Sequence, residues 1–407
     1  MNQESRICQN CKNSFVIEPE DFKFYEKIKI PPPTFCPECR AQRRFTWRNE
    51  RALYQSKCAL SGKNIITGFA PASGMVVYDR DVWWSDRWNP LDFGSEYDFS
   101  KPFFKQFYDL MKRSPMPAVF NARTINSDYV QHTGNFKNAY LVFASWGGEN
   151  VSYGARVNES KDSMDVLMVT NCELCYEAIS ANKSYRAFFS QNIDNCVDSY
   201  FLFECRGCSN CFGCTNLRNQ NYYIFNRPYT KEEYQRKIKE FDLGSYVKFR
   251  SVLEQFSELK QKALQRYANI FNSQAVTGDN IFNTSNCKNC FDVHGDVRDS
   301  KFITNALQIK DSYDGYGVGG FAELLYEVFD TGVQGSKLCF GAIIYGGFDV
   351  YYSYNCHGSN NLFACVGLRN KSYCILNKQY TKEEYEKLMP RIIEHMNQMP
   401  YTDKKGR

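Results

Sequence analysis

The sequence lacks the features of a membrane protein or a secreted protein. None of its apolar runs reaches the roughly 18 residues that a membrane helix needs, so we expect no contact with a bilayer. The first residues, MNQESRICQN, are too polar for a secretory signal peptide. We therefore expect a cytoplasmic location, where thiols stay reduced and cysteines bind metal or pack rather than form disulfides.

Motifs for several common catalytic sites are also missing. Neither G-x-S-x-G nor G-x-x-x-x-G-K-[ST] occurs, and the segment GYGVGGF lacks the strand and helix that a dinucleotide loop requires. None of the 4 histidines has H-x-x-x-H or H-x-E spacing. Acidic pairs such as Asp162 and Asp165 lie in turns, where they serve the backbone. We expect no catalytic residues and a protein that is not an enzyme.

Cysteine is abundant, with 18 residues in 407, and two pairs near the start have metal-ligand spacing. Cys8-x-x-Cys11 is followed 24 residues later by Cys36-x-x-Cys39, so each pair can donate two thiolates to one tetrahedral ion. Four sulfur ligands leave no position open for water, which makes the ion structural. The aromatic residues between the pairs predict a small β-ribbon around one Zn²⁺. Cys58 has no partner at this spacing, and we expect it to pack.

The segments CQNCKNSF, DFKFYEK and PPPTFCPECRAQRR resemble a known family. In this order they are similar to the zinc-ribbon domain of CxxC…CPECR type that occurs in uncharacterised bacterial proteins, over about residues 6 to 44. The resemblance implies a zinc site at the two cysteine pairs. The longer chain resembles cysteine-rich proteins of candidate-phyla bacteria for which no activity is established, so the resemblance implies no reaction.

All of the net positive charge lies near the start of the chain. Residues 1–65 contain 12 Lys and Arg against 7 Asp and Glu, and the rest of the chain is balanced. A basic stretch interleaved with aromatic residues can pair with phosphates and stack on bases, which favours RNA as a partner. If the stretch instead docks this module on the rest of the chain, a protein partner is expected. The candidate nucleic-acid-binding residues are Arg40, Arg43, Arg44, Trp47, Arg48 and Arg51.

The body of the chain is a duplication. Residues 198–234 align without a gap on residues 349–385, with 19 identities in 37 positions, whereas chance matching would give roughly two. Within each copy, short apolar runs follow polar turns about every 12 residues. Such a spacing is typical of strands in a solenoid.

The fold expected from this pattern is mainly β, with an N-terminal zinc ribbon followed by two duplicated β-solenoid-like lobes. A coil of 12 residues would enclose too little space for inward Tyr and Phe side chains, so we expect two or three 12-residue steps per coil. An antiparallel β-sandwich with the same strand spacing is the alternative.

Helices are expected to flank the lobes and cap their open ends. One begins near Pro102 and runs to about Arg113, two begin at the T-K-E-E capping boxes of Thr230 and Thr381, and another covers about 247–266. The expected domains are a zinc ribbon with its basic extension at 1–65, an aromatic linker at 66–98, lobe 1 at 99–245 and lobe 2 at 246–407.

A second cysteine-rich run, CRGCSNCFGC, suggests another metal site at Cys205, Cys208, Cys211 and Cys214. In the second copy the aligned residues are Cys356, Ser359, Leu362 and Cys365, and leucine cannot bind metal. A position that accepts Cys or Leu is a packing position. We expect these thiols to lie inside the coil, and a metal cluster is the open alternative.

Together these patterns favour a non-catalytic protein with one structural zinc ion that binds RNA or another protein, or acts as a scaffold. The alternatives are an enzyme that acts on a polymer in a solenoid groove, and a purely structural or assembly-forming protein. The oligomeric state is open.

Overall fold

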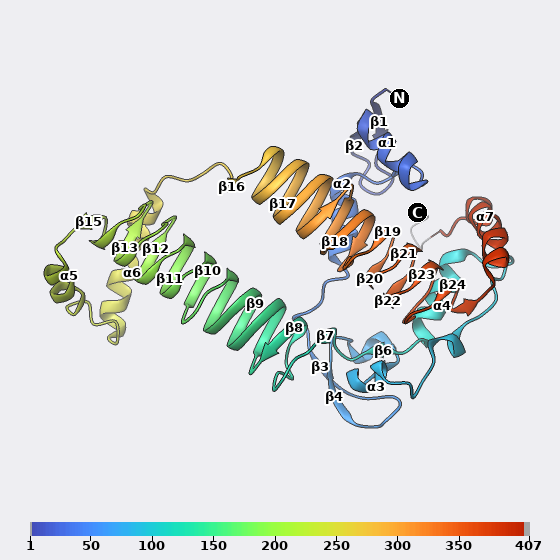
Figure 1. The fold of residues 1–407 in the computed structure, drawn as a ribbon, viewed down its shortest axis with the longest axis horizontal. Helices are drawn as coiled ribbons and strands as arrows, with labels where there is room; N and C mark the ends of the chain where they lie inside the picture. Colours follow the sequence, from blue (N-terminus) through green and yellow to red (C-terminus); the bar gives the residue numbers. More distant parts are fainter. Residues whose placement is uncertain (1, 403–407) are drawn as a thin grey trace.

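A computed structural model describes residues 2–402 and shows a mainly β protein built around two solenoids (Figure 1). The two stacks, which we call lobe 1 and lobe 2, run side by side in opposite directions because the chain reverses at a helical segment between them. A small cysteine module precedes them and packs on lobe 2. The predicted fold class is therefore confirmed, in place of the β-sandwich alternative.

The cysteine module consists of a hairpin and two helices. Its elements are β1 (Glu4–Ile7), β2 (Ser14–Ile17), α1 (Pro19–Ile28) and α2 (Pro37–Phe45). The DFKFYEK segment lies in α1, where Phe22, Tyr25 and Ile28 share one buried face at helical spacing. The expected β-ribbon is thus limited to the first hairpin, and the expectation that it continues between the cysteine pairs is wrong.

A second small module and a helix follow. They contain β3 (Tyr54–Lys57), β4 (Asn64–Thr67), η1 (Pro71–Ser73), β5 (Val77–Tyr78), α3 (Arg80–Trp84), η2 (Pro90–Phe93), α4 (Phe103–Arg113) and β6 (Met116–Pro117). The hairpin β3–β4 crosses the domain boundary expected at residue 65. The Trp83 and Trp88 side chains are buried together with Tyr78 in a core of their own.

Lobe 1 contains nine strands that pair in chain order. They are β7 (Asn121–Ala122), β8 (Gln131–Lys137), β9 (Tyr140–Thr170), β10 (Tyr176–Asn182), β11 (Tyr185–Asp194), β12 (Val197–Phe203), β13 (Ser209–Thr215), β14 (Asn221–Ile224) and β15 (Arg227–Pro228). All neighbours are parallel except β14 and β15, which are antiparallel. The helices α5 (Lys231–Ile238) and α6 (Tyr246–Gln261) follow and lie at this end of the lobe (Figure 1).

The solenoid has coils of 12 residues. Tyr176 pairs in parallel with Met164 before it and with Phe188 after it. A residue with positive φ recurs at every third position, as at Asp162 and Asp165. Asn and Asp are common at these positions because they tolerate the left-handed backbone. A coil therefore has four sides of three residues each, with one inward, one outward and one corner position.

The inward position of most sides in lobe 1 holds a small side chain. Val157, Ser160, Ser163 and Val166 are successive inward residues and are all buried, whereas Tyr153 is outside and 49% exposed. The expectation of two or three 12-residue steps per coil is wrong, because it assumed that Tyr and Phe point inward. Mostly small residues fill the narrow axis, and a few larger side chains such as Phe136 and Leu202 lie among them.

Lobe 2 has the same construction, but some of its coils have 11 or 13 residues, as between Ile270 and Ile281 and between Glu323 and Ser336. Its strands are β16 (Ile270–Phe271), β17 (Gln274–Lys310), β18 (Tyr313–Phe329), β19 (Ser336–Cys339), β20 (Ala342–Tyr345), β21 (Phe348–Tyr351), β22 (Tyr354–His357), β23 (Asn360–Phe363), β24 (Ser372–Ile375) and β25 (Lys378–Gln379). The helix α7 (Lys382–Gln398) ends the lobe. Both lobes thus finish with an antiparallel strand pair and a helix whose capping box, at Thr230 or Thr381, is formed as predicted.

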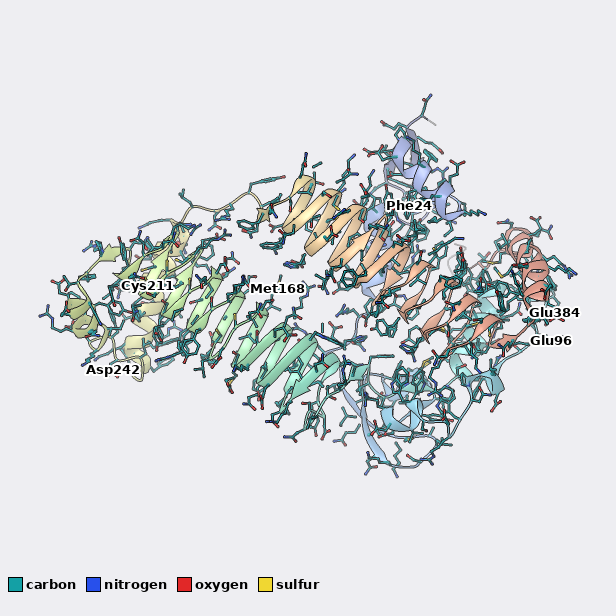
Figure 2. The ribbon with its side chains drawn as sticks, in the orientation of Figure 1. Phe24, Glu96, Met168, Cys211, Asp242 and Glu384 are labelled. Atoms are coloured by element: carbon teal, nitrogen blue, oxygen red, sulfur yellow. The ribbon has the colours of Figure 1, made fainter. Side chains whose placement is uncertain are left out.

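In the described part of the chain, side-chain contacts join the two lobes at three levels. Met168 lies on the side of lobe 1 that faces lobe 2 (Figure 2). The contacts are an ion pair between Arg156 and Asp292, a hydrogen bond between His132 and Asp330, and a cation–π contact of Arg206 over Phe271.

Candidate metal centre

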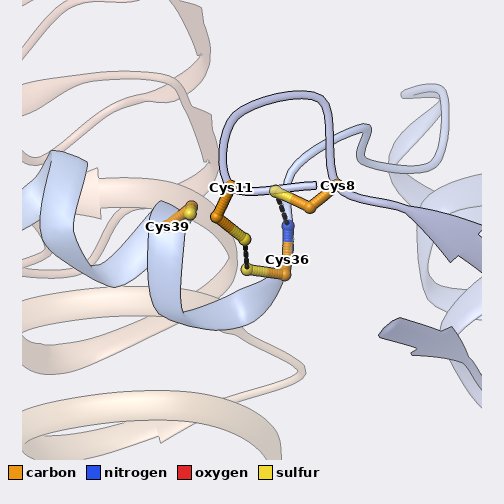
Figure 3. A group of neighbouring side chains, drawn as sticks. All are labelled: Cys8, Cys11, Cys36 and Cys39. Atoms are coloured by element: carbon orange, nitrogen blue, oxygen red, sulfur yellow. Dashed lines mark hydrogen bonds between the residues drawn. The ribbon is translucent and has the colours of Figure 1, made fainter. Parts of the chain in front are cut away.

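The four cysteines of the two C-x-x-C pairs, Cys8, Cys11, Cys36 and Cys39, converge at one end of the cysteine module (Figure 3). Their Sγ atoms all lie within 4.8 Å of one another, and no other group of this kind occurs among residues 2–402. The Sγ atoms of Cys11 and Cys36 are 3.7 Å apart. A tetrahedral ion with metal–sulfur bonds of about 2.3 Å would hold its sulfur atoms about 3.8 Å apart, so the cluster can hold a metal ion.

Local structure explains why the thiols meet. Cys8 directly follows β1 and Cys11 lies in the turn before β2, while Cys36 is the N-cap of α2 and Cys39 lies in its first turn. The Cys36 N–H donates to the Cys8 Sγ at 3.2 Å, and the Asn10 side-chain amide donates to the Cys39 Sγ at 3.3 Å. These bonds stabilise negative sulfur, the form that binds metal.

The electrostatics of Cys8 fit a ligand role. Burial raises the pKa of this thiol, but the backbone N–H groups of Cys36, Cys11 and Asn10 lower it more, to about 6. Cys8, Cys36 and Cys39 are buried, and only Cys11 is exposed. A metal held by all four sulfur atoms would have no open coordination position, which is typical of a structural site.

Half of the predicted arginine segment docks the cysteine module on lobe 2. The Arg40 side chain is 2% exposed and donates from Nε to Asp314 Oδ2 at 3.0 Å. Arg44 donates from Nη1 to the other oxygen of the same carboxylate, also at 3.0 Å. A second buried carboxylate, Glu327, accepts from Arg43 at 2.7 Å. We call these three arginines and two carboxylates the buried ion cluster.

The buried ion cluster shifts the pKa values of its members. Burial raises the pKa of Glu327, and the neighbouring Asp314 raises it further, while the three arginines lower it. Burial lowers the pKa of Arg40, but Asp314 outweighs it and raises that pKa above its usual value. Each buried charge therefore depends on its partner on the other side of the interface.

The remaining predicted residues are placed differently. Arg48 bonds Glu50 at 3.1 Å and lies over the rings of Tyr316 and Phe329, so it too is engaged inside the protein. Trp47 is 43% exposed and Arg43 is half exposed. Arg51 is exposed and lines a smaller groove between the lobes. Of the six candidates, only Arg43, Trp47 and Arg51 are offered to an external ligand.

A groove of about 900 Å³ opens where α2, α4 and lobe 2 meet. We call it the aromatic groove, because exposed rings surround it. The Trp47 ring lies 5.4 Å from Tyr354, which fixes its position. Two lining cations are about half exposed, Arg43, which pairs with Glu327, and Lys105, which pairs with Asp109. Its exposed aromatic residues are Trp47, Phe104, Tyr108 and Tyr401.

Sequence reasoning missed Asp314, Glu327 and the rings of α4. Asp314 stands at a corner position of β18 that resembles many others, and its partners lie about 270 residues earlier. Phe104 and Tyr108 are spaced for one helix face, which is the one signal that could have drawn attention to them. No pattern links that face to Trp47.

The second cysteine-rich run lies inside lobe 1. Cys205, Cys208, Cys211 and Cys214 occupy the four inward positions of one coil and are almost fully buried. Figure 2 shows Cys211 within the end of the stack. The prediction that these thiols are interior residues is confirmed. Their equivalents in lobe 2, from Cys356 to Cys365, are inward as well.

Comparisons with known proteins add little to this geometry. No family model matches the sequence, and no curated protein does. Solved structures do match, among them an acetyltransferase candidate from Desulfovibrio desulfuricans G20. It is 10% identical over 70% of this chain and 85% of that chain, with a TM-score of 0.15, which is too low to support any argument. Among residues 2–402, no helix has the length and apolar character needed to cross a membrane.

Proposed function

We propose that this protein is a non-catalytic binding protein that holds one structural Zn²⁺ ion and binds single-stranded RNA in the aromatic groove. The observation that carries the proposal is the groove itself, where exposed rings and accessible cations surround one space beside the cysteine module.

The choice of zinc follows from the ligands. Four cysteine sulfurs at tetrahedral separation favour Zn²⁺ over harder cations, which prefer oxygen. The ion would hold the hairpin β1–β2 against α2, which carries the buried arginines and ends two residues before Trp47. Zinc would therefore shape the aromatic groove from a distance without touching the ligand.

The choice of single-stranded RNA follows from the rings. Every base has a face that can stack on an aromatic side chain, and stacking contributes about 1–3 kcal/mol per base. Trp47, Phe104 and Tyr108 are each at least 42% exposed. Arg43 and Lys105 lie beside these rings and can pair with phosphates.

The structure also limits the electrostatic contribution. Arg40, Arg44 and Arg48 are paired inside the protein, so two accessible cations remain at this groove. Each phosphate contact on a single strand contributes about −0.7 to the slope of log K against log salt, so two contacts predict a slope of about −1.4. Glu327 is the only carboxylate among the described lining residues, and Arg43 pairs with it, so no observation favours an enzyme.

Titration of the full chain with a labelled uridine oligomer at several salt concentrations tests the proposal. Trp47→Ala should weaken binding by about 5- to 100-fold and leave the slope unchanged, because stacking releases no counterions. Arg43→Gln combined with Lys105→Gln should bring the slope close to zero. Arg236→Gln, on exposed α5 at the far end of lobe 1, removes one charge and serves as the control.

Two results would refute the RNA proposal. One is no binding at low salt by a protein with a full complement of metal. The other is binding that responds equally to the groove variants and to Arg236→Gln. In either case a protein partner becomes the better interpretation of the aromatic groove.

A further inference from the structure

Residues 54–84 repeat the backbone path of the cysteine module, although they share only one of its cysteines. β3 pairs with β4 in the same register as β1 with β2, at an offset of 50 residues. This offset places Cys58 at the position of Cys8, and Ser61 at the position of Cys11.

The turns that connect the two hairpins have the same hydrogen bonds. In both, the cysteine N–H donates to the carbonyl five residues later, at 2.8 Å after Cys8 and 2.9 Å after Cys58. In both, the cysteine carbonyl accepts the N–H four residues later, at 3.0 and 2.9 Å. That fourth residue is left-handed in each turn, with φ of 66° at Lys12 and 73° at Gly62.

The return of the chain to a helix also matches. In each module, the residue after the cysteine donates its N–H to a carbonyl two residues before the helix N-cap. The N-cap is Cys36 for α2 and Asp79 for α3. Three residues further along, Val82 stands where Cys39 stands in the first module. Only the connections differ, since α1 is replaced by the short η1.

We infer that residues 54–84 are a second copy of the cysteine module that folds without metal. Ser61, Asp79 and Val82 replace three of the four ligands, and Cys58 is the ligand that remains. Asp79 instead pairs with Lys63, at 3.3 Å. We call residues 54–84 the metal-free module.

In the metal-free module, a buried tryptophan side chain takes over the stabilising role that the metal has in the cysteine module. Trp83 occupies the helix position of Arg40, is fully buried, and donates from Nε1 to the Pro115 carbonyl at 2.9 Å. Arg369 of lobe 2 lies over the Trp83 ring, and the His357 ring is 5.9 Å away. Both modules therefore dock on lobe 2 through the same helix position, one by an ion cluster and the other by a ring.

The inference gives the two modules different tasks. The metal-free module clamps the start of the chain to lobe 2 whether or not zinc is bound. The cysteine module can lose its order with the metal, while the clamp stays in place. A chain without metal would thus lose the wall of the aromatic groove that the cysteine module supplies.

Restoring the missing ligands in the full chain tests the inference. The triple variant Ser61→Cys, Asp79→Cys and Val82→Cys should raise the zinc content from one to two ions per chain. A matched control, Leu60→Cys with Arg80→Cys and Asp81→Cys, places each of the three cysteines one residue out of register. The control should keep one ion, and a second ion in it or none in the folded triple variant would overturn the inference.

A second measurement uses the unaltered protein, so it does not depend on how the variants fold. Hydrogen exchange before and after removal of metal by a chelator should show lost protection in residues 4–45 and unchanged protection in residues 54–84. Protection that disappears from both segments together would show that the second module needs metal, which would overturn the inference.

Discussion

The buried ion cluster predicts that Arg40→Ala will undock the cysteine module while leaving the lobes folded. Arg40 is one of two donors to Asp314, whose carboxylate is fully buried. Removal of one partner of a buried pair costs about 3–5 kcal/mol, and the lower end applies because Arg44 still holds the same carboxylate. A loss of about 3 kcal/mol increases the open population roughly 100-fold.

Hydrogen exchange by mass spectrometry measures this change directly. Peptides from α2 and from the facing strand β18 should exchange roughly 100-fold faster in Arg40→Ala, and peptides from lobe 1 should be unchanged. Arg51→Ala is the control, because Arg51 lies outside the buried ion cluster and is exposed, so its loss should cost about 0.5 kcal/mol or less. Unchanged exchange in Arg40→Ala, or an equal effect of Arg51→Ala, would refute the reasoning.

Three further predictions concern the metal, the inward thiols and one histidine. Cys36→Ser with Cys39→Ser should abolish zinc binding, measured by elemental analysis, and an unchanged metal content would contradict the site. Cys208→Ser with Cys211→Leu, as in lobe 2, should lower the unfolding free energy by only about 1–3 kcal/mol in denaturant titrations, with no loss of metal. Burial, with Arg369 nearby, lowers the pKa of His357 to about 4, so the unfolded chain protonates first and stability should fall by up to about 3 kcal/mol as the pH drops from 6.5 to 4. His357→Phe should remove that part of the pH dependence.

The solenoid could be predicted from the 12-residue spacing, but the size of its coil could not. Aromatic residues dominate the visible pattern, yet residues such as Tyr140 and Tyr153 point outward and are more than 40% exposed. The informative signal was the small residue at every third position, which includes the cysteines of lobe 1. That period is hard to recognise because Val, Ala, Ser and Cys all satisfy it.

The metal cluster could be predicted because its ligands are close in sequence and their spacing matches the chemistry. The fate of Arg40 and Arg44 could not, because a buried and an exposed arginine look alike until Asp314 is placed beside them. The metal-free module was hidden for a different reason. Three of its four ligand positions have changed and its connection is shorter, so few identities remain although the hydrogen bonds do.

The contacts between the lobes restrict how this protein can change length. One coil adds 12 residues and extends a stack by about 4.8 Å, the spacing of neighbouring strands. Arg156 meets Asp292 and Arg206 meets Phe271 at different heights along both stacks. An insertion of one coil between Arg156 and Arg206 would shift the second contact by that rise while leaving the first in place. Growth of either lobe by whole coils therefore requires a matching insertion in the other, so that the contacts between the two stacks stay at the same height.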